Sequence, residues 1–240
     1  MKRNLLALAL LVPGAVVAQN VTPPERTVVV SATGTVERDP ERALLLLAVE
    51  STGATAQQAT QANATRMDAL IAEIRRRGIS AAQVRTVSYQ LTPEYARSPQ
   101  PPVPERQGPP RIIGYRAANM VQVTIDSVAR VGGVIDAAIQ AGANRVAGLR
   151  FELRDPQSAR LEALRLAVLR ARGEAEAMAS AAGQRLGPPL NINTHGEVEP
   201  RGFEMAGVRM DVAQAPPTPI EPGTLTITAS VTITFRLDPS

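Results

Sequence analysis

The chain has 240 residues, with 26 lysines and arginines against 22 aspartates and glutamates, one histidine, and neither cysteine nor tryptophan. The lack of cysteine excludes disulfides, thiolate metal sites, iron–sulfur clusters and cysteine nucleophiles. One histidine excludes sites built on several imidazoles, and three tyrosines with three phenylalanines are too few for a base-stacking surface. The composition therefore predicts no cofactor, no metal site and no nucleic-acid partner.

The first residues predict a cleavable signal peptide over residues 1–18. A positively charged start at 1–4 precedes an apolar run at 5–12, and the small residues at 15–18 suit cleavage before Gln19. An uncleaved anchor is the alternative, but this run is far shorter than the ~20 residues that span a bilayer. We therefore expect an exported, periplasmic protein with no transmembrane span after cleavage.

The chain after the signal is expected to be nearly neutral. Without Lys2 and Arg3, the basic residues fall from 26 to 24 against 22 acidic ones, which leaves a net charge of +2. Nucleic-acid binders normally carry a strongly basic face, so this charge argues against that class. The length allows one large or two small units. We expect a flexible segment at 19–25 and then an α+β domain at 26–240, with one or two lobes.

Hydrophobic periodicity predicts seven strands and three helices in this domain. Two-residue alternation and short apolar runs predict strands at 28–36, 42–50, 84–94, 112–125, 145–153, 190–195 and 225–237. A helical period predicts helices at 54–77, 128–141 and 156–182. The order β-β-α-β-β-α-β-α-β-β predicts an α+β fold of mainly antiparallel sheet with about three helices.

Some of these segments carry expectations about packing. Residues 43–49 are continuously apolar, which predicts a strand covered on both faces, by a helix of this chain or by a neighbouring copy. Asn63 interrupts an apolar helix stripe, either as a satisfied buried group or as a contact between copies. Asp126 with Ser127 and Asp155 are expected to cap the second and third helices. The third helix is expected to bury Leu161, Leu164, Val168, Ala171, Ala175, Met178 and Ala182.

Two stretches are predicted to be irregular loops. Residues 98–110 contain six prolines, which lack the N–H group that a central strand needs. Residues 193–223 contain no long periodic segment and five prolines. Long unstructured stretches within a domain are usually functional or mobile. These two loops are therefore the candidate sites of a binding function.

Residue types and spacing reveal no catalytic site. His195 is the one imidazole that a Ser-His-Asp triad could use, and no nucleophile-elbow sequence accompanies it. The following acids lie at helical spacing from arginines, as in solvated ion pairs: Glu162 with Arg165, Glu174 with Arg170, and Glu73 with Arg76 and Arg77. We identify no catalytic, cofactor-binding or metal-ligating residue. A hydrolase that uses paired carboxylates remains an alternative.

Several short motifs, in order along residues 26–237, resemble the SIMPL-domain family, which includes bacterial oxidative-stress defence proteins and periplasmic immunogenic proteins. The motifs lie at 29–34, 39–40, 78–86, 114–119, 142–144, 167–183 and 219–223. They include G-Y-R-A-A-N, G-A-N and P-I-E-P-G. Gly173 is a departure, because the family usually has lysine at this helical position.

The resemblance implies an exported α+β protein that forms ring-like oligomers near the outer membrane. It also implies a link to oxidative-stress tolerance, without an agreed activity or active-site residues. The expected partners are further copies and a component of the envelope or outer membrane. Without cysteine, any protection would be indirect, apart from sacrificial methionines. The main hypothesis is a non-enzymatic, self-assembling envelope protein; the alternative is a periplasmic binding module that uses loops 98–110 and 193–223.

Overall fold

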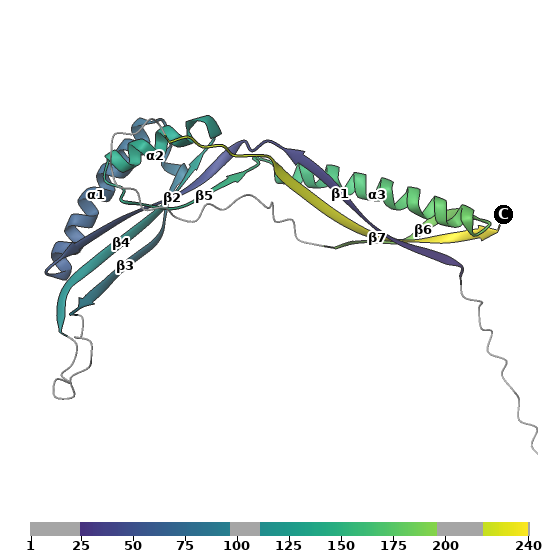
Figure 1. The fold of residues 1–240 in the computed structure, drawn as a ribbon, viewed down its shortest axis with the longest axis horizontal. Helices are drawn as coiled ribbons and strands as arrows, with labels where there is room; N and C mark the ends of the chain where they lie inside the picture. Colours follow the sequence, from purple (N-terminus) through teal and green to yellow (C-terminus); the bar gives the residue numbers. More distant parts are fainter. Residues whose placement is uncertain (1–24, 97–110, 196–217, 240) are drawn as a thin grey trace, which may run out of the picture.

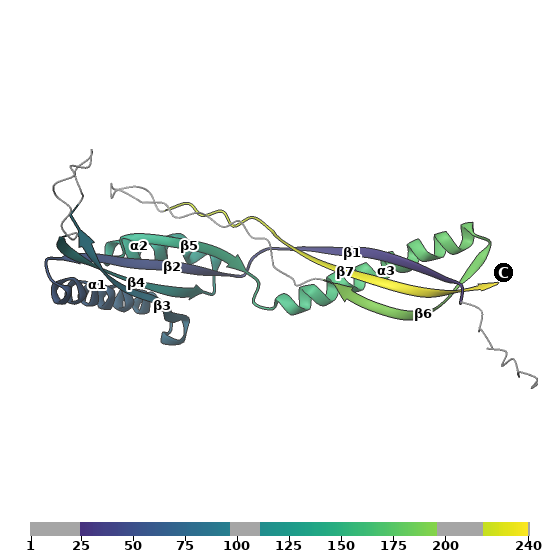
Figure 2. The same ribbon diagram turned by 90° about the horizontal axis from the view of Figure 1, so that it is seen from below.

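The computed structural model describes residues 25–96, 111–195 and 218–239, which form three α-helices and seven strands in two antiparallel sheets. The elements follow the predicted order, which confirms the α+β prediction. Figure 1 shows an elongated, arched molecule in which the two sheets lie end to end and the helices line the convex side. Figure 2 shows from below that the strands run along both halves of the molecule.

The first half of the molecule is a four-stranded sheet with the order β3-β4-β2-β5. Its strands are β2 (Arg42–Gly53), β3 (Val84–Tyr95), β4 (Ile112–Ile125) and β5 (Arg145–Glu152). The helices α1 (Ala56–Arg76) and α2 (Val131–Gln140) pack on one face of this sheet. The core between them is built from buried aliphatic side chains, including Leu45, Leu47, Leu70, Ile74, Val121, Val123 and Val131.

The helix α1 begins two residues later than predicted and packs through the predicted apolar stripe. Thr55 Oγ1 accepts a hydrogen bond from the Gln58 N–H, and the Thr55 N–H donates to Gln58 Oε1, which forms a capping box. Gly78 follows the helix with a φ of 77°, in the left-handed region that favours glycine. The predicted stripe supplies all the buried residues of α1: Ala59, Asn63, Met67, Leu70 and Ile74.

Strand β2 buries one face more deeply than the other. Leu45 and Leu47 are fully buried against the helices, whereas Leu44 and Leu46 point to the opposite face and are only half-buried. Within the described ranges, no helix covers that opposite face, which is called the open face below. The prediction that a helix of this chain covers this second face is therefore wrong for the described residues. Cover by a neighbouring copy stays a prediction.

The helix α2 starts later than predicted and without the predicted cap. A short 3₁₀ turn, Val128–Arg130, comes first, and the Ser127 side chain makes no capping hydrogen bond to it. The Asp126 carboxylate instead accepts a hydrogen bond from Gln83 Nε2 at 2.7 Å. The helix end agrees with the prediction, because Gly142 follows with a φ of 113°.

The second half of the molecule is a three-stranded sheet with the order β1-β7-β6. Its strands are β1 (Thr27–Arg38), β6 (Gln184–His195) and β7 (Leu225–Pro239), and the helix α3 (Pro156–Ala181) covers one face. β1 and β7 pair over the whole of β1, from Thr27 opposite Arg236 to Arg38 opposite Leu225. The first and last strands of the described chain are therefore neighbours.

The side chains of α3 that are fully buried against the sheet are all alanines, and Leu164 packs partly buried beside them. Asp155 caps it as predicted, by accepting hydrogen bonds from two backbone N–H groups of the first turn. The predicted stripe is partly right, because Ala171 and Ala175 are buried and Leu164 and Val168 pack against the core, whereas Leu161 and Met178 are each 53% exposed. The buried residues recur every four positions: Ala159, Ala163, Ala167, Ala171, Ala175 and Ala179. This repeat drifts by about 40° per step on a helix of 3.6 residues per turn, so the stripe winds around α3.

A close approach between β1 and α3 accounts for these alanines. A Cβ atom built on Gly34 would lie 2.0 Å from the carbonyl oxygen of Ala163 and 2.7 Å from the nitrogen of Ala167. A large side chain does not fit between two backbones at this separation. Arg170 reaches the same strand and donates to the Thr33 carbonyl oxygen at 3.0 Å. The leucines of α3 consequently lie on its flanks and outer side.

Residues 218–223 form a strap that packs on α2 before the chain enters β7. Thr218 Oγ1 donates to Asp136 Oδ1 at 2.8 Å, and Ile220 packs against the core between the four-stranded sheet and its helices. A Cβ atom on Gly132 would lie 2.5 Å from the Thr218 carbonyl oxygen. The strap therefore depends on a glycine at this position of α2, and it ties the segment before β7 to the four-stranded half.

Replacing Gly132 with alanine is expected to loosen the strap. The new methyl group would overlap the Thr218 carbonyl oxygen, and such overpacking costs about 1–3 kcal/mol. We expect hydrogen exchange at the backbone amides of 218–223 to accelerate by roughly tenfold, since local opening governs exchange. Gly133→Ala is the matched control, because the nearest atom to its new Cβ would be 3.9 Å away. Equal exchange in the two variants would contradict the strap.

Candidate functional site

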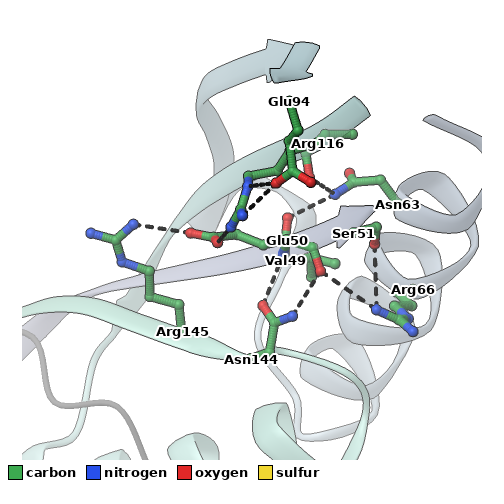
Figure 3. A network of polar contacts seen from close by, with 10 residues as sticks. Val49, Glu50, Ser51, Asn63, Arg66, Glu94, Arg116, Asn144 and Arg145 are labelled. Carbon is green, nitrogen blue, oxygen red and sulfur yellow. Dashed lines mark hydrogen bonds and ion pairs between the residues drawn. The ribbon is translucent and has the colours of Figure 1, made fainter. Parts of the chain in front are cut away.

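A network of ion pairs joins the four strands of the first sheet on its open face (Figure 3). Glu50 of β2 lies at the centre, with one carboxylate oxygen 3.2 Å from Arg116 Nη1 and the other 3.0 Å from Arg145 Nη1. Arg116, on β4, also pairs with Glu94 of β3 at 2.5 Å. Each strand contributes one charged residue, so the two acids and two arginines balance in charge.

The electrostatics of this network favour the charged forms. Hydrogen bonding from Arg145 is the main cause that lowers the pKa of Glu50; burial opposes this effect, and Arg116 adds to it. The pKa of Arg116 is raised, chiefly by its hydrogen bond to Glu94. A carboxyl group that acts as a general acid near neutral pH needs a raised pKa. Glu50 is therefore suited to holding two arginines in place and not to donating a proton.

Asn144 fixes the backbone of Glu50 from the neighbouring turn. Its Oδ1 accepts the Glu50 N–H at 2.8 Å, and its Nδ2 donates to the Glu50 carbonyl oxygen at 2.7 Å. The Asn144 N–H also donates to the Ala48 carbonyl oxygen at 3.2 Å. A single side chain thereby continues the hydrogen-bond ladder of β2 beyond the start of β5. This contact gives the G-A-N motif a structural role at the network.

Asn63 lies on the opposite, buried side of the same strands. Its side chain is fully buried, and Nδ2 donates to the carbonyl oxygens of Val49 at 2.7 Å and Ala117 at 3.1 Å. Its Oδ1 is buried without a partner among the described residues. Of the two alternatives considered above, the buried polar group is confirmed for the Nδ2 donor. Asn63 therefore holds β2 and β4 to α1.

Replacing Glu50 with glutamine is expected to destabilise the fold by about 0.5–1 kcal/mol at neutral pH, a typical value for partly exposed ion pairs. The folded pKa of Glu50 lies below its unfolded value near ~4.3, so the stabilisation is present above that pH. It is lost as the pH falls through the folded pKa. The difference between wild type and variant in urea unfolding midpoints should therefore shrink from about pH 6 to about pH 3.

The control for this titration is Glu174→Gln, a change at an exposed position of α3. It should alter the unfolding midpoint little at any pH, since isolated surface changes are usually within about 0.5 kcal/mol. A difference between wild type and Glu50→Gln that does not vary with pH would contradict the ionic role of Glu50.

An open cleft of about 480 Å³ lies between α3 and β6 in the second half of the molecule. Its lining is mainly apolar and includes Val168, Leu186, Pro189, Ile192 and Phe235. Arg172 of α3 also lines the cleft and pairs with Glu176 at 2.9 Å. This arrangement can accept a ligand with an apolar body, and the two carboxylates that line it, Glu176 and Asp238, each pair with an arginine.

The structure bears on only part of the predicted sites. His195 ends β6, so residues 193–195 of the expected second loop are strand, and the strap at 218–223 is its other described part. The whole of the first loop, 98–110, and residues 196–217 of the second lie outside the described residues. Glu73 pairs with Arg76 and Arg77 as predicted. Glu162 instead pairs with Arg38 of β1.

The described ranges contain no cluster of histidine and acidic side chains that could hold a metal ion. None of the helices in those ranges combines the length and apolarity required to cross a membrane. The residues of the ion-pair network were mostly missed by sequence reasoning. Arg116 and Asn144 belong to the motifs quoted above, whereas Glu50, Glu94 and Arg145 carried no signal.

Comparison with known proteins identifies relatives along nearly the whole chain. The SIMPL family model, described as a protein of unknown function (DUF541), matches residues 28–235. The uncharacterized protein YggE of Edwardsiella ictaluri is 27% identical over 199 residues, which cover 81% of this chain and 80% of that protein. The YggE protein of Escherichia coli K12 is 26% identical over 251 residues, with 100% and 95% coverage.

A third relative carries a name that states a location. The 26 kDa periplasmic immunogenic protein of Brucella melitensis is 27% identical over 222 residues, which cover 91% of this chain and 87% of that protein. The family match includes every quoted motif, from the opening strand to the strap at 218–223. Because it also spans most of the 240 residues, this protein belongs to the SIMPL family.

Proposed function

We propose that this chain is an exported, non-enzymatic protein of the bacterial envelope that assembles with copies of itself. The observation that carries the proposal is the placement of exposed large apolar side chains. One group lies on the hairpin formed by β3 and β4: Val87, Tyr89, Leu91, Tyr95, Ile112 and Ile113. A second group lies on the outer side of α3: Leu161, Leu166, Leu169 and Met178. Gathered apolar surfaces of this kind mark contact sites.

The chemistry of the described residues supports a non-enzymatic role. The ion-pair network keeps Glu50 charged, and a lowered carboxyl pKa is the opposite of what acid catalysis near neutral pH needs. The exposed Arg172 and Glu176 at the α3 cleft pair with one another. Glu50 and Glu94 meet at Arg116, which pairs with both, so they do not form the free acid and base that a carboxylate hydrolase requires.

Export and the stress link rest on sequence and relatives. Residues 1–18 have the charge, apolar run and small residues of a signal peptide, and one relative is named a periplasmic protein. A role in oxidative-stress tolerance follows from the family resemblance. The chain has no cysteine, so such protection would act through assembly or through a partner in the envelope.

Expression of the full chain in a bacterial host tests both parts of the proposal. We expect the protein in the periplasmic fraction with its N-terminal segment removed, and multi-angle light scattering should then give a mass of several copies. A strict monomer at micromolar concentration would end the assembly proposal. Retention of an unprocessed chain in the cytoplasm would end the export proposal.

A second candidate function is a periplasmic binding module that takes an envelope ligand through loops 98–110 and 193–223. The specific observation in its favour is the apolar cleft of about 480 Å³ beside β6, the strand that contains residues 193–195. Native mass spectrometry of protein taken directly from the periplasm should then detect a bound apolar molecule. Deletion of residues 99–109 should abolish ligand capture without loss of the fold.

A further inference from the structure

Building on the proposed self-assembly, we propose that copies of this chain contact one another head to tail. The outer leucines of α3 in one copy would pack on the β3–β4 hairpin of the next copy. The helix stripe is defined as Leu161, Leu166 and Leu169. The hairpin shelf is defined as Tyr89, Leu91 and Ile113. These contact surfaces can be tested separately from assembly itself.

The hairpin shelf lies on the helix-covered side of the first sheet. Tyr89 pairs with Asn119 and Leu91 pairs with Ala117, which is buried on that side, so all four side chains share one face. The helix α1 packs mainly on β2 and β4 and covers only a small part of the outermost strand, β3. Tyr89 and Leu91 are accordingly 51% and 40% exposed. The shelf resembles an unfilled position for another helix beside α1.

The helix stripe lies on the side of α3 that faces away from its sheet. Leu161 and Leu169 are 53% and 60% exposed, while the alanines on the inner side are buried. Leu166 and Leu169 are three residues apart, and Leu161 is eight residues before Leu169, so the three occupy one broad face. A helix with buried alanines and exposed leucines has its larger apolar side chains available for a partner.

The apolar area agrees with a specific contact. Side chains of this size expose roughly 80–100 Å² each when half covered, so the six apolar residues of the hairpin present about 500 Å². A standard interface buries about 800 Å² per partner. About 60% of such an area is apolar, which is close to the estimate for the hairpin. The surface is therefore large enough for a copy of the chain and larger than scattered exposed residues would give.

Pairing of β3 edges is a poorer explanation. The outer edge of β3 has a register shift between Thr86 and Ser88, and Pro93 lacks an N–H group. Bulges and prolines at an edge disfavour the addition of another strand. The side chains on the face of the hairpin, and not its backbone, are therefore the available contact.

A contact within one chain is excluded by the arrangement of the halves. Figure 1 shows α3 in one half of the arch and the β3–β4 hairpin at the far end of the other half. A shelf-to-shelf dimer would leave the helix stripe of both copies uncovered. One head-to-tail contact covers both surfaces, and its repetition gives a ring if the rotation closes or a filament if it does not.

Complementation between two defective copies tests this inference. The helix variant carries Leu161→Gln and Leu169→Gln, and the shelf variant carries Tyr89→Thr and Leu91→Thr; all four positions are exposed. Each full-length variant, exported and purified alone, should associate at least tenfold more weakly than wild type in sedimentation velocity. An equimolar mixture should form a one-to-one dimer and nothing larger, because each pair retains one intact contact.

The control is Val29→Thr on β1, an apolar position that is 57% exposed and belongs to neither surface. It should assemble as wild type does. Circular dichroism should give wild-type spectra for every variant, and Leu169→Gln alone should weaken assembly if a double variant fails to fold. A monomeric wild type would overturn both the assembly proposal and this inference.

Other outcomes overturn the head-to-tail contact alone. Assembly of both variants at wild-type strength would do so, and a mixture that stays monomeric would exclude the complementary pairing. Vesicles that contain phosphatidylglycerol test a lipid as the occupant of the shelf. If the shelf variant assembles as wild type but no longer floats with these vesicles, the hairpin faces lipid and the proposed contact is wrong.

Discussion

Gly34→Ala is expected to lower stability by about 3 kcal/mol or more, and the thermal midpoint by roughly 10 °C. The added Cβ would lie 2.0 Å from the carbonyl oxygen of Ala163, which is a backbone atom and cannot move aside alone. Either β1 or α3 must shift, and the shift separates the alanine stripe from the three-stranded sheet. Circular dichroism during heating measures the effect.

The matched control is Gly173→Ala, on α3, the helix that Gly34 approaches. No atom lies within 4 Å of the position that its Cβ would take, so the change adds helix propensity without a clash. We expect it to stabilise the protein by about 0.5–1 kcal/mol. If Gly34→Ala melts within a degree or two of wild type, the close approach of β1 to α3 is wrong.

Asn63→Asp is expected to cost about 3–5 kcal/mol at neutral pH, the range for an uncompensated buried charge. Asn63 donates to the carbonyl oxygens of Val49 and Ala117, and an aspartate there would place a carboxylate against two acceptors. The folded pKa of the new carboxyl group would rise above its unfolded value near ~3.9. The destabilisation should therefore be smallest below that pH and grow as the pH rises towards the folded pKa.

Urea unfolding of wild type and Asn63→Asp at several pH values measures this dependence. Asn191→Asp, at an exposed position on β6, is the control and should change stability by less than about 0.5 kcal/mol. A cost for Asn63→Asp that is the same at about pH 3.5 and pH 7 would contradict the donor role of Asn63.

The order of elements and the packing of α1 could be predicted from the sequence because their signals are local. The polar cap at Thr55, the apolar spacing along α1 and the glycine at its end agree with one another. In α3 the local signal is partly misleading, because leucine is a stronger apolar signal than alanine and so favours Leu161, which the structure exposes. The packing of α3 is decided by Gly34, more than a hundred residues away in the sequence. This glycine lets the backbone of β1 approach α3 so closely that a leucine does not fit between them.

The ion-pair network could not be predicted for a similar reason. Glu50, Glu94, Arg116 and Arg145 come together only through the register of four strands. Periodicity predicts which residues share a face of one strand, but it does not predict which residue of another strand lies opposite. The prediction from the apolar run in β2 is limited in the same way. The pattern shows that both faces of the strand are apolar, but it does not show what packs over Leu44 and Leu46.

The pairing of β1 with β7 has a consequence for the order of folding. Every strand of the four-stranded sheet lies between Arg42 and Glu152, so that half can form before β6 and β7 take their places. β1 precedes it in the chain, yet its partner β7 follows it as the last of the described strands. Such distant pairing closes slowly. Until β7 is in place, β1 is a strand without a sheet, open to chaperones and to the strands of other unfolded chains.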